Sequence, residues 1–198
     1  MIGWSIAAAI KSGVFARIIV STDDAEIASI ARDEGAETPF HRPPALSDDH
    51  TPTVPVIAHA VQVLDLAPGT PVCCLYATAP MVQAEDVSHG LTLLTPDTTY
   101  VVSVTRYPFP IQRALRCAPD FAIAMIDPSQ MTTLSQDLEE AWHDAGQFYW
   151  AHARTWTAGK PVFGPGARGV PLPRHRVQDI DTPDDWRMAE ALFALLKT

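Results

Sequence analysis

Two aspartates near the carboxyl terminus are the residues best suited to chemistry. Asp179 and Asp181 are two positions apart within residues 177–186, so in an extended backbone both carboxylates project from one face while Ile180 turns away. Mg²⁺ commonly takes one or two carboxylates and completes its shell with water and substrate phosphates. The spacing therefore predicts a metal site, and the alternative interpretation is a solvated acidic turn before a helix.

The residues that follow this pair predict the start of a helix. Thr182 suits an N-cap, Pro183 suits the first helical position, and Asp185 completes a Thr-x-x-Asp variant of the capping box. We expect a strand that leads from Pro173 to Ile180 and then a helix over 183–196. A strand end and a helix cap would together hold both carboxylates in place.

Composition narrows the class of protein. The 198 residues, 47% hydrophobic and 19% charged, predict one soluble globular domain. A net charge of -9 argues against nucleic acid or an anionic membrane as the main partner, and no apolar run is long enough to span a membrane. Cys73, Cys74 and Cys117 have neither disulfide nor metal-ligand spacing, which favours reduced thiols and a cytoplasmic location.

Apolar periodicity predicts helices alternating with strands. This order is typical of a three-layer α/β sandwich around a mostly parallel sheet. Residues 107–128 break the alternation and predict short strands and turns. The expected helices cover 4–12, the residues from Asp24 to Gly35, 54–66, 85–94, 155–160 and 183–196, and the expected strands cover 17–21, 72–77, 100–105 and 148–152.

Polar segments follow the expected strands, where open α/β sheets bind ligands. Besides the acidic pair, these segments are 21–24, 42–53 and 75–80. Each alone has a simple structural interpretation, such as a helix cap or a surface charge. The glycine-rich stretch 164–169 can cradle an anion, but its flanking prolines favour a surface loop. The sequence contains no GxGxxG motif and no P-loop.

Taken together, these segments resemble the CMP-sugar synthetases, also called acylneuraminate cytidylyltransferases. The resemblance extends over nearly the whole chain. The sequence is most similar to the branch that activates pseudaminic acid, a bacterial nine-carbon sugar acid. Sialic acid enzymes usually carry Gln in place of Tyr76 and Asn in place of Ala145. The matching strings are IIVSTDDAEIA (18–28), RPPALSDDHTPT (42–53), LYATAP (75–80), AGQFYW (145–150) and VQDIDTPDDW (177–186).

The resemblance implies a Rossmann-like nucleotidyltransferase fold and a reaction. The anomeric hydroxyl of a 2-keto sugar acid attacks the α-phosphorus of CTP, pyrophosphate leaves, and positioning together with Mg²⁺ carries the catalysis. It also implies a homodimer in which an insert over about 108–160 packs against the partner and completes its site. The implied roles are metal binding and catalysis for Asp179 and Asp181, nucleotide binding for Arg42, Thr51 and Thr53, and sugar binding for Tyr76, Thr78, Gln147 and Tyr149.

The start of the chain departs from the family. Members begin with a strand and a basic loop of the type IPARGGSKRIPRKNI that grips the triphosphate, followed by a segment like GKPMIGWSI, and residues 1–6 match only the end of that segment. We therefore expect this chain to lack the central first strand and the phosphate loop, through a misplaced start codon or a truncated gene product. Two alternatives stay open. One is an inactive remnant that binds a sugar acid or pairs with a full-length homologue, and the other is a GT-A-type glycosyltransferase with its metal on the DxD.

Overall fold

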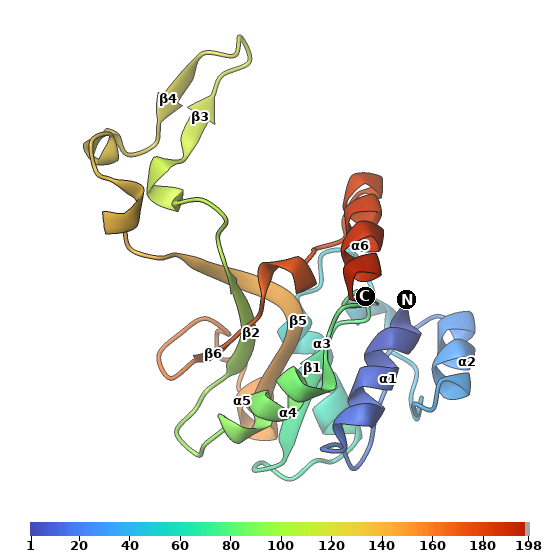
Figure 1. The fold of residues 1–198 in the computed structure, drawn as a ribbon. Coiled ribbons are helices and arrows are strands. Elements are labelled where there is room, and N and C mark those ends of the chain that lie inside the picture. The colour runs from blue at the N-terminus through green and yellow to red at the C-terminus, as the bar shows by residue number, and fades with distance from the viewer. Residues whose placement is uncertain (197–198) are drawn as a thin grey trace.

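The computed structural model describes residues 1–196 and contains a four-stranded mixed sheet (Figure 1). The order is β1 (Pro71–Leu75), β5 (Trp142–His152), β2 (Val101–Arg106) and β6 (Arg168–Pro171). β5 runs antiparallel to β1 and to β2, whereas β2 and β6 pair in parallel. Three strands therefore share one direction, which confirms the α/β fold with a mostly parallel sheet.

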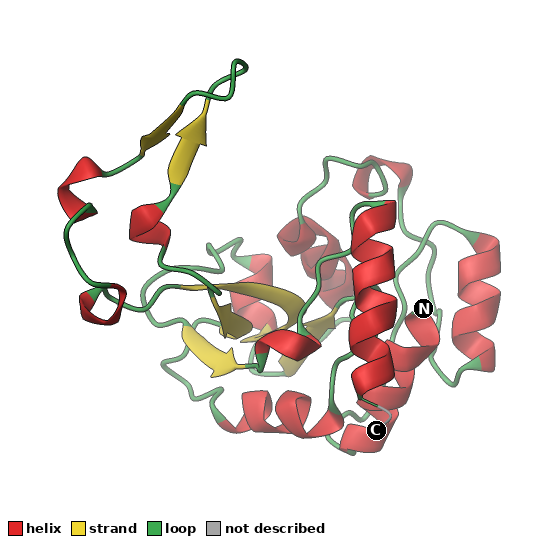
Figure 2. Cartoon of the chain, turned by 45° about the horizontal axis from the view of Figure 1, so that its top comes forward, coloured by secondary structure: helices red, strands yellow, loops and turns green. Residues whose placement is uncertain are grey.

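Helices cover both faces of this sheet and produce three layers (Figure 2). The two cores meet at the strands, because Val101 contributes to one and its neighbour Val102 to the other. The first core takes α1 and α4, and the second takes α3 and α5. The helices are α1 (Ile2–Ser12), α2 (Ala25–Asp33), α3 (Thr53–Val63), α4 (Ala84–Thr92), α5 (Ala153–Thr157) and α6 (Pro183–Leu195).

Tryptophan side chains fasten helices to the sheet. Trp150 is 1% exposed, and its indole N–H donates to the carbonyl of Val87 in α4 at 3.0 Å. Trp156 of α5 is fully buried and donates to the carbonyl of Val72 at 3.3 Å. Each ring thus buries a large apolar area without leaving its N–H unpaired.

The strand predicted over 17–21 is wrong. Those residues form one isolated parallel bridge, between Ile19 and Glu37. The Val20 N–H donates to the Glu37 carbonyl at 2.9 Å, and the Glu37 N–H donates to the Ile18 carbonyl at 2.8 Å. A strand needs hydrogen-bonded neighbours, and no strand of the described chain pairs with the other side of this segment.

The sheet layer is interrupted between residues 17–21 and β1. β1 is an edge strand within residues 1–196, and a cavity of about 390 Å³ lies between it and residues 17–21. Side chains of α1 and α3 also line this cavity. The space between the two helices is therefore open where a further strand of the sheet would lie.

The strand predicted to run into the acidic pair is also wrong. β6, which the sequence did not reveal, ends at Pro171, and residues 174–176 form a 3₁₀ turn. Pro171 and Pro173 lack the N–H that a ladder requires. Residues 177–181 are therefore unpaired with any strand, although the helix predicted after them is confirmed as α6.

Residues 107–141 form an arm that leaves the body after β2 and returns at β5 (Figure 1). It carries the hairpin of β3 (Leu115–Cys117) and β4 (Ile123–Met125). Within the range 108–160, residues 142–157 belong instead to β5 and α5 of the body. The dimerisation role of this range stays a prediction. Among residues 1–196, no helix is both long and apolar enough to cross a membrane.

Candidate functional site

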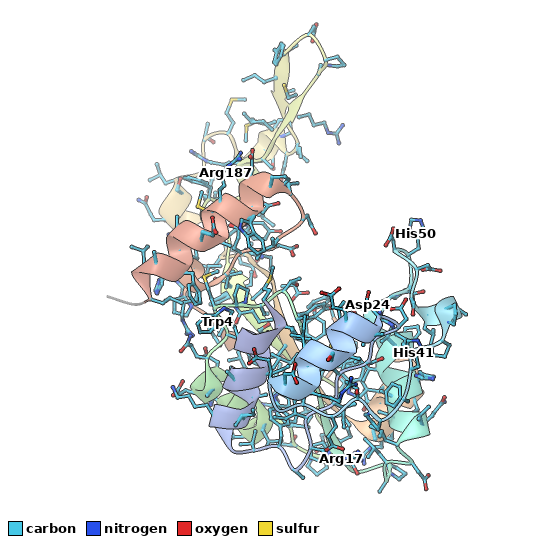
Figure 3. The ribbon with its side chains drawn as sticks, turned by 90° about the vertical axis from the view of Figure 1, so that its right-hand side faces the viewer. Trp4, Arg17, Asp24, His41, His50 and Arg187 are labelled. Atoms are coloured by element: carbon cyan, nitrogen blue, oxygen red, sulfur yellow. The ribbon has the colours of Figure 1, made fainter. Side chains whose placement is uncertain are left out.

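Four of the residues expected to bind substrates line the cavity beside β1. Arg42 and Thr51 come from the loop after α2, Thr53 opens α3, and Tyr76 directly follows β1. Figure 3 shows the same region from the side, with Asp24 at the start of α2 and His41 and His50 on the loop. Folding therefore gathers residues that lie up to 34 positions apart in the sequence.

The Arg42 side chain is held in place near the amino-terminal end of α2. Its guanidinium contacts Asp23 at 3.3 Å and donates through Nε to the Ser47 hydroxyl at 3.1 Å. Hydrogen bonds from its own backbone N–H and from Arg42 lower the pKa of Asp23. Asp24, the neighbouring carboxylate, is the N-cap of α2. Because the guanidinium has five donors, these contacts leave donors for an anionic or carbonyl oxygen.

The two threonines make different contacts. The Thr51 hydroxyl donates to Asp48 at 2.8 Å, and this bond is the main cause that lowers the pKa of Asp48. The Thr53 hydroxyl lies 2.7 Å from the Tyr76 hydroxyl. The first bond fixes the loop before α3, and the second ties α3 to the residue after β1.

An aromatic wall extends from Tyr76 into the sheet. Tyr76 and Tyr149 meet edge to face, with centroids 5.4 Å apart, and the Tyr149 hydroxyl donates to Asp144. Burial raises the pKa of Tyr149, and the hydrogen bond to Asp144 raises it further. Burial likewise raises the pKa of Tyr76. Both phenols therefore stay neutral. Tyr76 lines the cavity, whereas Tyr149 is buried in the core behind it.

Asp144 is a site residue that the sequence did not reveal. It is five positions before Tyr149 in β5, and strict alternation along a strand would put residues an odd number apart on opposite faces. A register shift opposite β2 and a positive φ of 61° at Gly146 reverse that relation. The only local signal is the Asp-x-Gly pattern, because Asp144 also accepts from the Gly146 N–H at 2.9 Å.

Thr78, Gln147 and Tyr149 do not line this cavity. Thr78 is exposed in the turn after β1. Gln147 is 3% exposed, and its amide nitrogen donates to the carbonyl of Arg176 at 2.5 Å. Its amide oxygen is buried and has no hydrogen-bond partner in the described part of the chain. Gln147 therefore contacts the segment that leads to the acidic pair.

Asp179 and Asp181 are both exposed, in irregular chain before α6 that bends at Asp181. Within residues 1–196 no group of three or more Asp, Glu, His or Cys side chains is placed to hold a metal. Two carboxylates alone fit Mg²⁺, which draws its other ligands from water and phosphates. The confirmed capping box fixes the end of this segment, because Thr182 and Asp185 exchange side-chain and backbone hydrogen bonds.

An α/β sandwich with polar side chains gathered beyond a strand end is typical of nucleotide-binding proteins. Comparison with known proteins identifies the family within this class. Residues 1–146 match the family described as Cytidylyltransferase. The chain belongs to the cytidylyltransferase family.

Two curated relatives and one solved structure illustrate the similarity. The pseudaminic acid cytidylyltransferase of Campylobacter jejuni is 34% identical over 98% of this chain and 84% of that protein. The CMP-N,N'-diacetyllegionaminic acid synthase of Legionella pneumophila is 27% identical over 98% of this chain and 85% of that protein. The structure of CMP:2-keto-3-deoxy-manno-octonic acid synthetase complexed with CTP aligns over 98% of this chain and 88% of that one. Its TM-score of 0.68 at 14% identity shows a shared fold.

Proposed function

We propose that the protein transfers CMP from CTP to a nonulosonic acid, most specifically pseudaminic acid, with release of pyrophosphate. One observation carries the proposal. Arg42, Thr51, Thr53 and Tyr76 line a single cavity beside β1 in a chain 34% identical to a pseudaminic acid cytidylyltransferase. A cavity with donors at its polar residues and an apolar wall suits a nucleotide beside a deoxy sugar.

The side chains divide between the two substrates. Arg42, Thr51 and Thr53 bind the cytosine and ribose of CTP, with the guanidinium held ready by Asp23. The sugar acid is bound by the group Tyr76, Thr78, Gln147 and Tyr149. Since Thr53 engages the Tyr76 hydroxyl, Tyr76 offers mainly its ring, and the buried Tyr149 supports that ring edge to face. Gln147 offers its unpaired amide oxygen.

Asp179 and Asp181 are proposed to hold Mg²⁺. A bound Mg²⁺ would offset the negative charge of the CTP phosphates. Asp179 and Asp181 would hold that cation between two anchored residues, Arg176 before them and Thr182 after them. Their exposure leaves room for phosphate oxygens and water as the remaining ligands.

We infer that turnover requires a further strand and a basic phosphate-binding loop. The open edge of β1 and residues 17–21 flank the cavity that such a strand would fill. No glycine-rich basic loop of the family type occurs in the 198 residues. Without it, few backbone N–H groups or cations are available for the β- and γ-phosphates.

We further propose a homodimer that works in the cytoplasm. The arm over 107–141 exposes large apolar side chains, including Phe121 at 84% and Phe109 at 79%, and exposed apolar surface favours protein association. A second copy is the expected partner, with neither nucleic acid nor membrane required. The free thiols of all three cysteines are consistent with a reducing compartment.

The test uses the chain with an amino-terminal extension that carries the family strand and basic loop. Product CMP-sugar and pyrophosphate are measured with CTP, Mg²⁺ and pseudaminic acid. Asp179→Asn and Asp181→Asn should each abolish Mg²⁺-dependent transfer and leave the thermal midpoint nearly unchanged, because exposed carboxylates add little stability. Near-normal turnover in both single variants would eliminate the metal site. Failure of the extended protein with every nonulosonic acid would eliminate the proposed reaction.

Both alternatives have distinct signatures in the same assays. A remnant would remain dimeric and would bind neither CTP nor Mg²⁺ even after extension. A GT-A-type glycosyltransferase would consume a nucleotide sugar in the presence of an acceptor. The structure offers a specific observation for the cytidylyltransferase only, namely that Arg42, Thr51, Thr53 and Tyr76 line one cavity.

A further inference from the structure

The acidic pair lies in a segment that no sheet holds. Residues 177–181 are unpaired with any strand. Apart from hydrogen bonds that the Gln178 amide and the Asp181 N–H donate to Asp185, their position comes from the two ends of the segment. At the far end, the capping box of α6 fixes Thr182. At the near end, Arg176 is bound from two other elements of the fold.

We propose that Asp86, Gln147 and Arg176 act as positioning residues for the acidic pair, and we call these three residues the Arg176 clamp. The proposal rests on the metal role suggested above for Asp179 and Asp181. It assigns those carboxylates a support that is remote in sequence, because Asp86 lies in α4 and Gln147 in β5.

The clamp holds Arg176 by both its side chain and its backbone. The guanidinium contacts the two Asp86 carboxylate oxygens at 2.5 and 3.4 Å, and the side chains are only 15% and 18% exposed. The Gln147 amide nitrogen donates to the Arg176 carbonyl at 2.5 Å. A forked ion pair fixes orientation as well as distance, so the chain direction after Arg176 is set.

Arg176 is close enough in sequence to Asp179 and Asp181 to restrict their positions. Asp179 follows Arg176 by three residues, and Asp181 precedes the cap residue Thr182 by one. A segment of this length between two fixed ends has few conformations, and releasing one end restores backbone freedom. Both carboxylates would then sample positions in which they no longer share a cation.

Gln147 connects the clamp to the proposed sugar side. Its amide nitrogen is used by Arg176, while its buried amide oxygen has no partner among the described residues. A buried acceptor without a partner is costly, and a hydroxyl or amide donor of the sugar acid would satisfy it. Binding of the sugar and placement of the acidic segment would then depend on one side chain.

Hydrogen–deuterium exchange of the 198-residue chain tests the hold directly. Asp86→Asn and Gln147→Leu should each speed exchange of the amides of residues 177–182 by about tenfold or more, because a partly buried partner is lost. Glu85→Gln is the matched control, since Glu85 adjoins Asp86 and pairs with Lys11 at 3.3 Å with both side chains about 70% exposed. Its exchange over 177–182 should be unchanged, as should exchange in β2 for all three variants.

A second measurement separates the clamp from the proposed metal site. In the extended protein, Asp86→Asn should raise the Mg²⁺ concentration for half-maximal transfer by about tenfold and leave the KM for CTP unchanged. Arg176→Lys, which keeps the charge without the fork, should fall between Asp86→Asn and wild type. Unchanged exchange in both clamp variants would overturn the clamp. Faster exchange with an unchanged Mg²⁺ requirement would overturn its role in metal binding and count against Asp179 and Asp181 as ligands.

Discussion

One irregular residue decides which side chains form the aromatic wall. Gly146 takes a positive φ of 61° where β5 changes register against β2, a conformation that glycine adopts at little cost. The change brings Asp144 to the same face as Tyr149, and the carboxylate then accepts the phenol hydrogen. Tyr149 in turn packs edge to face on Tyr76, so a backbone feature in β5 shapes the residue after β1.

The bond between Asp144 and Tyr149 predicts coupled effects on stability. In urea unfolding, Asp144→Asn and Tyr149→Phe should each destabilise, and their effects should fail to add by about 1 kcal/mol, as expected of residues in direct contact. Tyr100→Phe is the control, because its hydroxyl donates to Lys160 and not to Asp144. Additive effects for Asp144 and Tyr149 would show that the bond does not form in solution.

Tyr76 predicts the choice of sugar. Its hydroxyl is engaged by Thr53, so the ring faces the site and suits a deoxy, acylamino sugar better than a hydroxyl-rich glycerol tail. The extended enzyme should prefer pseudaminic acid to N-acetylneuraminic acid in kcat/KM. Tyr76→Gln should reduce that preference by about tenfold, the scale of discrimination by an apolar pocket, with little change in the KM for CTP. A wild type that favours N-acetylneuraminic acid would remove the assignment to this branch and leave the family unaffected.

At the scale of elements, α6 shows how a local signal anchors a distant contact. Thr182 and Asp185 form the capping box, and Phe193 on the same helix packs against Trp4 of α1 with centroids 4.8 Å apart. The carboxyl-terminal helix thereby covers the start of the amino-terminal one. The cap fixes the entry of α6, and the aromatic contact fixes its direction.

The cap should contribute measurably and in a pH-dependent way. Thr182→Ala should lower the free energy of unfolding by about 1 kcal/mol. Hydrogen bonds from the Thr182 hydroxyl and backbone lower the pKa of Asp185, so its stabilisation is present above the unfolded value of about 3.9 and is lost as the pH falls through the lower folded value. The free energy of unfolding of Asp185→Asn should therefore be lower than that of wild type at neutral pH, and the difference should shrink below about pH 4. Asp184→Asn is the neighbouring control, and an equal, pH-independent deficit in both would contradict the role of the cap.

Across the whole molecule, the sheet layer has an opening whose two sides present backbone groups that are unpaired within residues 1–196. The Tyr76 N–H donates to Gln147 in β5, so alternation directs the N–H groups of Cys73 and Leu75 toward the open edge. Ile19 presents its backbone from the other side of the cavity, because its neighbours Ile18 and Val20 bond to Glu37. Two facing edges of this kind favour a strand between them.

The opening predicts that the 198-residue chain and the extended chain differ in CTP binding and in turnover. The 198-residue chain should bind CTP poorly and form negligible CMP-sugar, whereas the extended chain should turn over. Extension should also slow exchange of the amides of Cys73, Leu75 and Ile19, while that of Val102 in the interior of the sheet stays unchanged. Robust CMP-sugar formation by the short chain would show that another segment, such as residues 164–169, binds the phosphates.

Local features of this protein can be predicted from its sequence. Caps and periodicity depend on neighbouring residues, so they can be predicted from the sequence. This holds for the capping box at Thr182 and for the apolar strands near 72–77 and 100–105, and the family resemblance is likewise a property of the sequence. Strand pairing could not be predicted from the sequence pattern. Residues 17–21 and 173–180 have strand-like sequences but lack neighbours to pair with, whereas β6 pairs in spite of its glycine and proline.

Contacts between residues distant in the sequence depend on how the whole chain packs. Asp144 joined the aromatic wall through a change of register, and Gln147 reached Arg176 across 29 positions. Asp86 found Arg176 across 90 positions. Such contacts depend on which strands become neighbours, and that is a property of the whole chain's packing that no local pattern records.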